Sequence, residues 1–282
     1  MTTLSPLQIG SLCIADPVLL APMSGVTDMP FRRLVKSFGV GLVVSEMIAS
    51  REMLHDSRRT RELLRRSDDE KPIAVQLAGC EADVMAEAAK INEQEGVALI
   101  DINMGCPAKK VVNGQAGSAL MRDERLAGAI LKSVVDAVNV PVTLKMRTGW
   151  DRDSRNAPAI ARIAEEVGIQ ALSVHGRSRE CRYHGPIDYE TIARVKWSVS
   201  IPVIANGDID SPQTALQVLR TTGADAVMVG RAAQGQPWLL GRIKHLLEAA
   251  GVNLNLTPEQ VARHQGSHTG LFLANEAAGM AA

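Results

Sequence analysis

Two stretches near the end of the chain decide the fold: Val-Ile-Ala-Asn-Gly-Asp-Ile-Asp-Ser-Pro at residues 203–212 and Gly-Ala-Asp-Ala-Val-Met-Val-Gly-Arg at residues 223–231. Each contains a short apolar run, as expected of a strand that is buried on both faces. Between the runs, Ser211 and Pro212 supply an N-cap and a first-turn proline, and Gly223 supplies the left-handed residue that ends a helix. The order strand, helix, strand predicts a parallel βαβ unit.

The same unit recurs upstream of residue 203. Gly96 and Gly168 repeat the helix-ending glycine a few residues before a strand. Eight units in 282 residues fit a closed barrel better than an open doubly wound sheet, and no Gly-x-Gly-x-x-Gly pattern follows the first strand. We therefore predict an α/β fold, a (β/α)8 TIM barrel, with strands at Val18–Pro22, Leu42–Glu46, Ile73–Leu77, Leu99–Asn103, Val142–Arg147, Ala171–His175, Val203–Asn206 and Ala226–Val229.

Three segments are expected. Residues 1–17 precede the barrel, and Leu7–Ile14 is predicted to form a hairpin that plugs its N-terminal end. The barrel itself is expected at residues 18–250, ending in a helix around Pro237–Ala250. Residues 251–282 begin with helix-start signals but lose their periodicity, which predicts a short, incomplete helical extension that is partly disordered.

Charge balance and cysteine spacing narrow the class of protein. Lys plus Arg and Asp plus Glu both number 31, so no overall field attracts nucleic acid, and any RNA contact depends on where charges are placed. No signal peptide or membrane-spanning apolar stretch is evident, which predicts a soluble, cytoplasmic protein without a membrane partner. The four cysteines lack paired spacing, and His264 and His268 lack a third ligand, so no metal site is predicted.

The loops after the last two strands carry a phosphate-binding pattern. In such barrels the active site lies at the carboxyl ends of the strands, and phosphates bind after strands seven and eight. Asn206-Gly207-Asp208 and Gly230-Arg231 occupy those places. Glycines let backbone N–H groups approach an anion, and Arg231 can pair with it. The alternative is ordinary turn glycines with one surface arginine, and the pattern alone does not separate FMN from a sugar phosphate.

Lys145 lies near the end of the fifth strand. A lysine that points into a barrel is costly unless it meets an anion. It could form a Schiff base, face the negative edge of a reduced flavin, or form an internal ion pair with Glu46 or Asp101.

Cys106 follows the fourth strand in a Gly-Cys-Pro loop on the same face. A thiol has an ordinary pKa of about 8.5, so it is protonated at neutral pH and can act as a general acid. The alternative is a buried structural cysteine, which is the role predicted for Cys13 and Cys80.

Seven motifs together resemble the tRNA-dihydrouridine synthases, and the bacterial B-type branch is the most similar. The resemblance runs in order from about residue 6 to residue 250. The motifs are Ala-Pro-Met-Ser-Gly-Val-Thr-Asp (21–28), Val-Gln-Leu (75–77), Asp-Ile-Asn-Met-Gly-Cys-Pro (101–107), Lys-Met-Arg (145–147), His-Gly-Arg-Ser-Arg (175–179), Ala-Asn-Gly-Asp-Ile (205–209) and Val-Gly-Arg (229–231).

The resemblance implies an enzyme that reduces the 5,6 double bond of particular tRNA uridines with bound FMN and with NADPH as electron donor. The protein is expected to be a monomer. NADPH would reduce the flavin, which would pass hydride to C6 of the uracil, and Cys106 would protonate C5. Asn103 and Arg177 would hold the uracil. The implied flavin contacts are Pro22, Met23 and Ser24 at the ring, Gln76 and Lys145 at its polar edge, and His175, Asn206, Gly207, Asp208, Gly230 and Arg231 at the ribityl phosphate end.

A tRNA substrate requires a basic rim around the site, because the target uridine must be extruded from the folded RNA. The loops at 103–115, 147–155 and 175–184 hold eight Lys or Arg and three Asp or Glu, a net charge of +5. Family members usually carry a C-terminal helical domain that grips tRNA, and residues 251–282 are expected to be its remnant. Two alternatives therefore stay open: a barrel that acts on a free pyrimidine, like the dihydroorotate dehydrogenases, and a flavin-binding barrel without tRNA activity.

Overall fold

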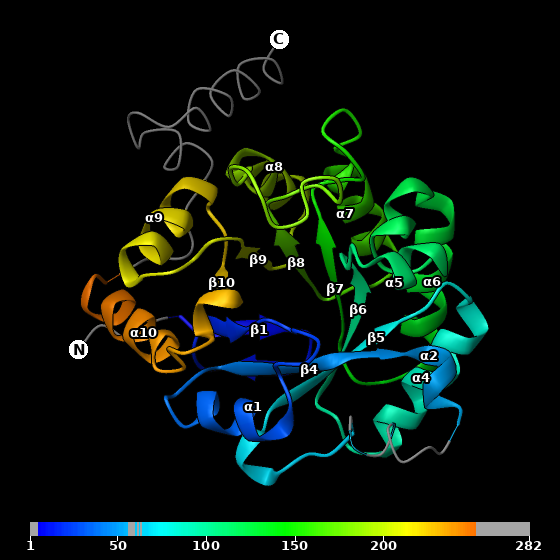
Figure 1. The fold of residues 1–282 in the computed structure, drawn as a ribbon, viewed down its shortest axis with the longest axis horizontal. Helices are drawn as coiled ribbons and strands as arrows, with labels where there is room; N and C mark the ends of the chain where they lie inside the picture. The colour runs from blue at the N-terminus through cyan, green and yellow to red at the C-terminus, as the bar shows by residue number, and fades with distance from the viewer. Residues whose placement is uncertain (1–4, 56–59, 61, 63, 252–282) are drawn as a thin grey trace.

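The computed structural model describes residues 5–55, 60, 62 and 64–251, so the predictions for residues 252–282 lie outside the described residues. Parallel strands form a closed barrel in the order β10-β3-β4-β5-β6-β7-β8-β9 (Figure 1). The predicted TIM barrel is confirmed. Its strands are β3 (Val18–Leu20), β4 (Leu42–Ala49), β5 (Ile73–Ala78), β6 (Leu99–Met104), β7 (Val142–Arg147), β8 (Ala171–His175), β9 (Val203–Asn206) and β10 (Ala226–Val229).

The strand ends differ from prediction only in the first half of the barrel. β3 stops at Leu20, just before Pro22, which has no N–H to donate to a neighbouring strand. β4 runs on to Ala49 through a register shift between Val44 and Met47. Such a bulge bends a strand and turns its side chains to new directions. β5 and β6 each extend one residue beyond the predicted end.

Helices surround the barrel (Figure 1). Gly96, Gly168 and Gly223 have φ angles of 77°, 98° and 66°, which confirms their predicted left-handed conformation. The predicted N-cap is also confirmed, since the Ser211 hydroxyl accepts a hydrogen bond from the Thr214 amide. The helices are α1 (Met29–Lys36), α2 (Ser50–Met53), α4 (Ala82–Gln94), α5 (Lys109–Asn113), α6 (Glu124–Ala137), α7 (Ala157–Glu166), α8 (Tyr189–Ser198), α9 (Pro212–Thr222) and α10 (Leu239–Ala249), with 3-10 turns η1 (Asp68–Glu70), η2 (Gly117–Arg122) and η3 (Arg231–Ala233).

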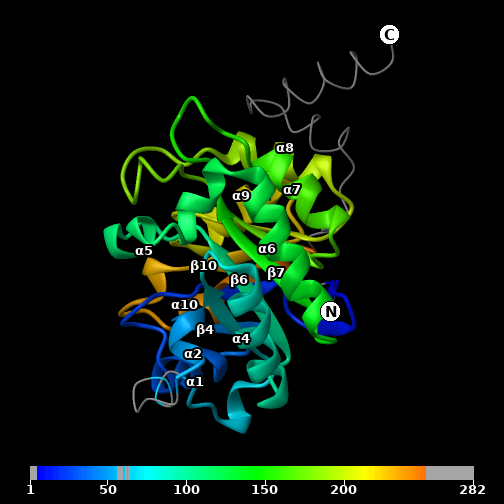
Figure 2. The same cartoon turned by 90° about the vertical axis from the view of Figure 1, so that its right-hand side faces the viewer.

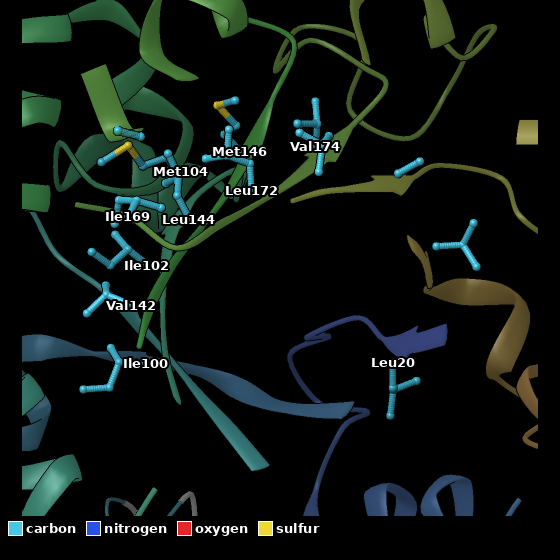
Figure 3. Packing of buried hydrophobic residues seen from close by; sticks show 14 of the residues in the cluster. Leu20, Ile100, Ile102, Met104, Val142, Leu144, Met146, Ile169, Leu172 and Val174 are labelled. Carbon is cyan, nitrogen blue, oxygen red and sulfur yellow. The ribbon is translucent and has the colours of Figure 1, made fainter. Parts of the chain in front are cut away.

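Alternation along the strands separates two apolar layers. Ile100, Ile102 and Met104 of β6 belong to the large buried cluster shown in Figure 3. Their neighbours on the strand have the opposite orientation, because successive side chains of a strand point to opposite faces. One of these neighbours, Leu99, belongs to a second buried cluster inside the barrel.

The N-terminal hairpin contributes to that second cluster. β1 (Leu7–Ile9) pairs antiparallel with β2 (Leu12–Ile14). Their buried side chains pack with residues near the amino ends of the barrel strands, including Leu19, Leu42 and Ala226. One end of the barrel interior therefore has an apolar floor, and the polar residues of β5 to β9 lie beyond it.

At the opposite end of the barrel, the carboxyl ends of the strands lead into long loops. Figure 2 shows α5 and the loops that follow β7 and β8 on one side of the barrel, away from the N-terminal segment. Within the described residues, no helix is long and apolar enough to cross a membrane.

Candidate functional site

Strand register brings the predicted interior residues together. Asn103 pairs with Lys145 across β6 and β7, and His175 pairs with Asn206 across β8 and β9. Gln76 of β5 pairs with Asp101 of β6, which lies two residues before Asn103 and so closer to the apolar floor. Because these strands are parallel, the side chains form a polar ring between the apolar floor and the open face.

A chain of hydrogen bonds crosses this ring. The Asp101 carboxylate accepts from the Thr143 hydroxyl (2.7 Å) and from Gln76 Nε2 (2.7 Å). Gln76 Oε1 in turn accepts from Asn103 Nδ2 at 2.7 Å. Asn103 Oδ1 accepts from the backbone amide of Cys106 at 3.0 Å. Asn103, predicted to contact uracil, thus also fixes the Cys106 loop. The sequence did not identify Asp101 and Thr143 as site residues, and their only signal was a polar residue at an interior strand position.

The Cys106 loop is fixed from several sides. The Cys106 carbonyl accepts from the backbone N and the hydroxyl of Ser118 (3.1 and 2.9 Å). Gly117 has a φ of +61°, and a Cβ there would lie 2.8 Å from that carbonyl oxygen, so the turn requires glycine. Arg147 Nε donates to the Gly105 carbonyl at 2.6 Å. Cys106 itself is a free, half-buried thiol.

The other cysteines do not all match their prediction. Cys13 is exposed, so the buried role predicted for it is wrong. It alternates with inward-facing residues on a two-stranded hairpin, and its side chain therefore points outward. Cys80 is half-buried and lies 3.3 Å from the Gly114 carbonyl.

Lys145 has an amide partner and, among the residues that the structure describes, no carboxylate partner. Its Nζ donates to Asn206 Oδ1 at 3.2 Å, and Asn206 Nδ2 donates to the Met228 carbonyl at 2.8 Å. Neither of the predicted ion pairs of Lys145 occurs among the described residues, because Glu46 instead accepts from the backbone amide of Gly25 at 2.6 Å. Burial lowers the pKa of Lys145 to about 8, although the charge of Asp101 opposes the shift.

The predicted phosphate loops hold a carboxylate between two arginines. Gly207 has a φ of +135°, and a Cβ there would lie 2.8 Å from Ile187, so only glycine fits. The Asp208 carboxylate accepts from both terminal nitrogens of Arg177 and from Arg231 Nη2 at 2.9 Å. Its hydrogen bonds from Arg177 hold the pKa of Asp208 below its usual value. The Asp208 side chain therefore positions arginines, and only its backbone N–H is of use to a phosphate.

Arg177, predicted to hold uracil, is buried and links the loop after β8 to Asp208 after β9. It is 4% exposed, and besides Asp208 it donates to the carbonyls of His184 and Gly185. Four of its five N–H groups are thus engaged within the protein. The structure favours a role in holding the loop after β8 over a direct contact with uracil.

His175 is a neutral donor or acceptor. Burial, together with the positive charges of Arg147, Lys145, Arg177 and Arg231, lowers its pKa well below the usual value. Its imidazole is therefore uncharged at neutral pH.

Tyr183 was missed by the sequence analysis. It is 47% exposed in the loop after β8, and the guanidinium groups of Arg147 and Arg231 lie 5.5 and 5.4 Å from its ring centroid. Its signal was a lone aromatic residue among arginines. Such a ring suits a planar ligand at the mouth of the site.

The residues predicted to line the flavin ring lie in a loop that hydrogen bonds hold in place. Pro22, Met23 and Ser24 follow β3, and the Met23 amide donates to the Thr27 hydroxyl at 3.0 Å. The Thr27 carbonyl accepts from the buried side chain of Arg32 at 2.7 Å.

Fewer rim cations are available to bind RNA than the eight Lys and Arg residues counted in the sequence. Arg147 and Arg177 are buried, and Arg155 pairs with Asp188 at 3.0 Å. The rim cations that remain exposed or half-exposed without an ion pair among the described residues are Lys109, Lys110, Arg152, Arg179 and Arg182. No group of three or more His, Cys, Asp or Glu residues in the described part of the chain could hold a metal ion.

Comparisons with known proteins point to one family. Residues 19–273 match the family model described as Dihydrouridine synthase (Dus). The chain is 58% identical over 246 residues to "tRNA-dihydrouridine synthase B" of Xanthomonas axonopodis pv. citri, covering 87% of this chain and 74% of that one. It is 53% identical over 255 residues to the protein of the same name from Pseudomonas aeruginosa, covering 90% and 76%. A "Probable tRNA-dihydrouridine synthase" of Rickettsia bellii is 56% identical over 243 residues, covering 86% and 74%.

Proposed function

Because the chain belongs to the dihydrouridine synthase family of tRNA-modifying oxidoreductases, we propose that it reduces the 5,6 double bond of particular tRNA uridines with FMN and NADPH. The proposal rests chiefly on Cys106, a free thiol fixed at the open end of a polar barrel interior. A tRNA substrate also implies work in the cytoplasm.

The residues present fit FMN. Lys145 offers a cation without a carboxylate partner among the described residues, and Gln76 keeps one N–H beyond its bond to Asp101. Both suit the polar edge of the flavin. Gly207 and Gly230 have no side chain that could keep a phosphate from their backbone N–H groups. Arg231 is half-exposed and its Nη2 donates to Asp208, while its other side-chain N–H groups have no partner among the described residues and can bind a phosphate. We propose residues 18–250 as the FMN-binding unit.

When bound, FMN supplies hydride for C6 of the uracil. Cys106 gives its thiol proton to C5 and leaves a thiolate that solvent reprotonates. The hydrogen bonds to the backbone amide and carbonyl of Cys106 hold the backbone that carries the sulfur, and positioning of an acid in this way contributes to rate. His175, being neutral, can donate one hydrogen bond without adding positive charge.

A substrate comparison tests the proposed function. The purified protein should be yellow and, with NADPH, should form dihydrouridine in bulk tRNA while leaving free uracil and dihydroorotate unchanged. Turnover of a free pyrimidine would instead support the dihydroorotate dehydrogenase-like alternative. A colourless protein that FMN does not reconstitute would contradict the cofactor assignment.

Arg231→Ala is expected to weaken FMN binding by about 1.5–3 kcal/mol, roughly 10- to 150-fold, because a charge-assisted hydrogen bond to the phosphate is lost. Titration of FMN onto the apoprotein by flavin fluorescence measures the change. Arg220→Ala, at an exposed position in the last turn of α9, is the control. Equal affinity in all three proteins would remove Arg231 from the phosphate site.

Removing the rim arginines is expected to weaken tRNA binding and reduce its salt dependence. Each phosphate contact contributes a slope of about −0.9 in log K against log salt, so the triple variant Arg152→Ala/Arg179→Ala/Arg182→Ala should lose about 2–3 units of slope. The matched control, with the same charge change on the outer helices, is Arg125→Ala/Arg162→Ala/Arg242→Ala. If both triple variants lose the same slope, the rim has no special role.

A further inference from the structure

The Asp101 carboxylate occupies an unfavourable place. It is 3% exposed and lies on β6 next to Leu99, which belongs to the apolar floor. No cation lies within ion-pairing distance of it among the described residues, and its hydrogen-bond partners are the side chains of Thr143 and Gln76. Burial raises its pKa, against the hydrogen bonds from those partners and the charge of Lys145. A charged group in such a position calls for a functional reason.

Both oxygens of the Asp101 carboxyl group accept a hydrogen bond, one from Thr143 and one from Gln76, and this fixes the direction of the whole chain of hydrogen bonds. Gln76 must turn its NH₂ group toward Asp101, so its carbonyl oxygen faces Asn103. Asn103 must then donate to Gln76, which leaves its own oxygen for the amides of Gly105 and Cys106. If both amides were flipped, an NH₂ group would face the N–H of Cys106, and the loop would lose its anchor.

We propose that Asp101 is a positioning residue, which acts through Gln76 and Asn103 to hold the Cys106 loop. The same constraint gives each of the two amides one N–H that no described residue accepts, so the site presents donors to its ligands. The catalytic consequence rests on the proposed function, whereas the orientation of the loop does not.

Two substitutions at Asp101 separate acceptor geometry from charge. Asp101→Leu keeps the branched shape and removes the acceptor. Asp101→Asn keeps an oxygen toward Gln76 and turns its NH₂ toward the Thr143 hydroxyl, which can also accept. Thr143→Val is the matched control, since it removes the other hydrogen bond of the carboxylate and leaves Gln76 oriented.

The first readout is alkylation of Cys106 by iodoacetamide in the apoprotein, followed by mass spectrometry of the peptide that contains it. Asp101→Leu should speed alkylation several-fold because the loop is no longer anchored. The Asp101→Asn and Thr143→Val variants should react at nearly the wild-type rate. Thermal unfolding of each variant is measured alongside. If Asp101→Leu does not fold, Asp101→Val takes its place.

The second readout is uridine reduction by the flavin-loaded enzyme. Asp101→Leu should lower kcat about 10- to 100-fold, the scale expected when a reacting group is displaced by about 1 Å, and Asp101→Asn should restore most of it. The proposal would be overturned if Asp101→Leu kept the wild-type alkylation rate and the wild-type kcat. It would also be overturned if Asp101→Leu and Asp101→Asn lost the same share of kcat. If the wild-type protein itself fails to reduce tRNA, the proposed function fails, but the alkylation result still decides the role of Asp101.

Discussion

Cys106→Ala is expected to lower uridine reduction by about 10²–10⁴-fold, the usual contribution of a general acid. The substitution removes only the sulfur, because the bonds that fix this loop go to the backbone amide and carbonyl of Cys106. FMN binding and NADPH oxidation should therefore stay close to wild type. Dihydrouridine in tRNA is measured by mass spectrometry after a single turnover and at steady state.

Cys80→Ala serves as the control, since Cys80 is also half-buried and its thiol donates to the carbonyl of Gly114 in a loop. It should keep full activity. Wild-type turnover by the Cys106→Ala variant would show that the thiol is structural. Loss of FMN from that variant would show that the loop had collapsed, and the rate would then carry no information on proton transfer.

Arg32→Met is expected to destabilise the protein by about 3–5 kcal/mol, the typical result of removing one partner of a buried ion pair. Arg32 Nε lies 2.6 Å from Glu70, and both side chains are almost completely buried. Arg32 also donates to the carbonyls of Thr27 and Arg65, so its loss would leave these acceptors and the Glu70 charge unpaired. Because Thr27 holds the loop of Met23, FMN affinity should fall as well.

Urea unfolding of the apoprotein measures this change. The adjacent pair Arg33–Asp69 is largely exposed, so Arg33→Met should cost less than about 1 kcal/mol. The double variant Arg32→Met/Glu70→Leu should recover much of the lost stability, because no uncompensated charge remains. Equal midpoints for Arg32→Met and Arg33→Met would contradict the assigned importance of the buried pair.

Local patterns in the sequence were sufficient to predict the barrel fold. Apolar runs and helix-ending glycines predicted every barrel strand, and the last four strands were predicted with their observed bounds. The reason is physical: strand alternation, proline at a first turn and a left-handed glycine depend on neighbours within a few residues. The rule that active-site residues lie at the carboxyl ends of barrel strands placed Lys145, His175 and Asn206 on one open face.

Only the tertiary structure decided which of those side chains are partners. Gln76 and Asp101 are 25 residues apart, and Arg177 and Asp208 are 31 apart, so no local pattern could pair them. For this reason the sequence predicted Asp101 as a possible ion-pair partner of Lys145 and did not predict its hydrogen bond to Gln76. Hydrogen bonds in a closed barrel depend on which strands become neighbours and at what height, and that is fixed only when the barrel closes.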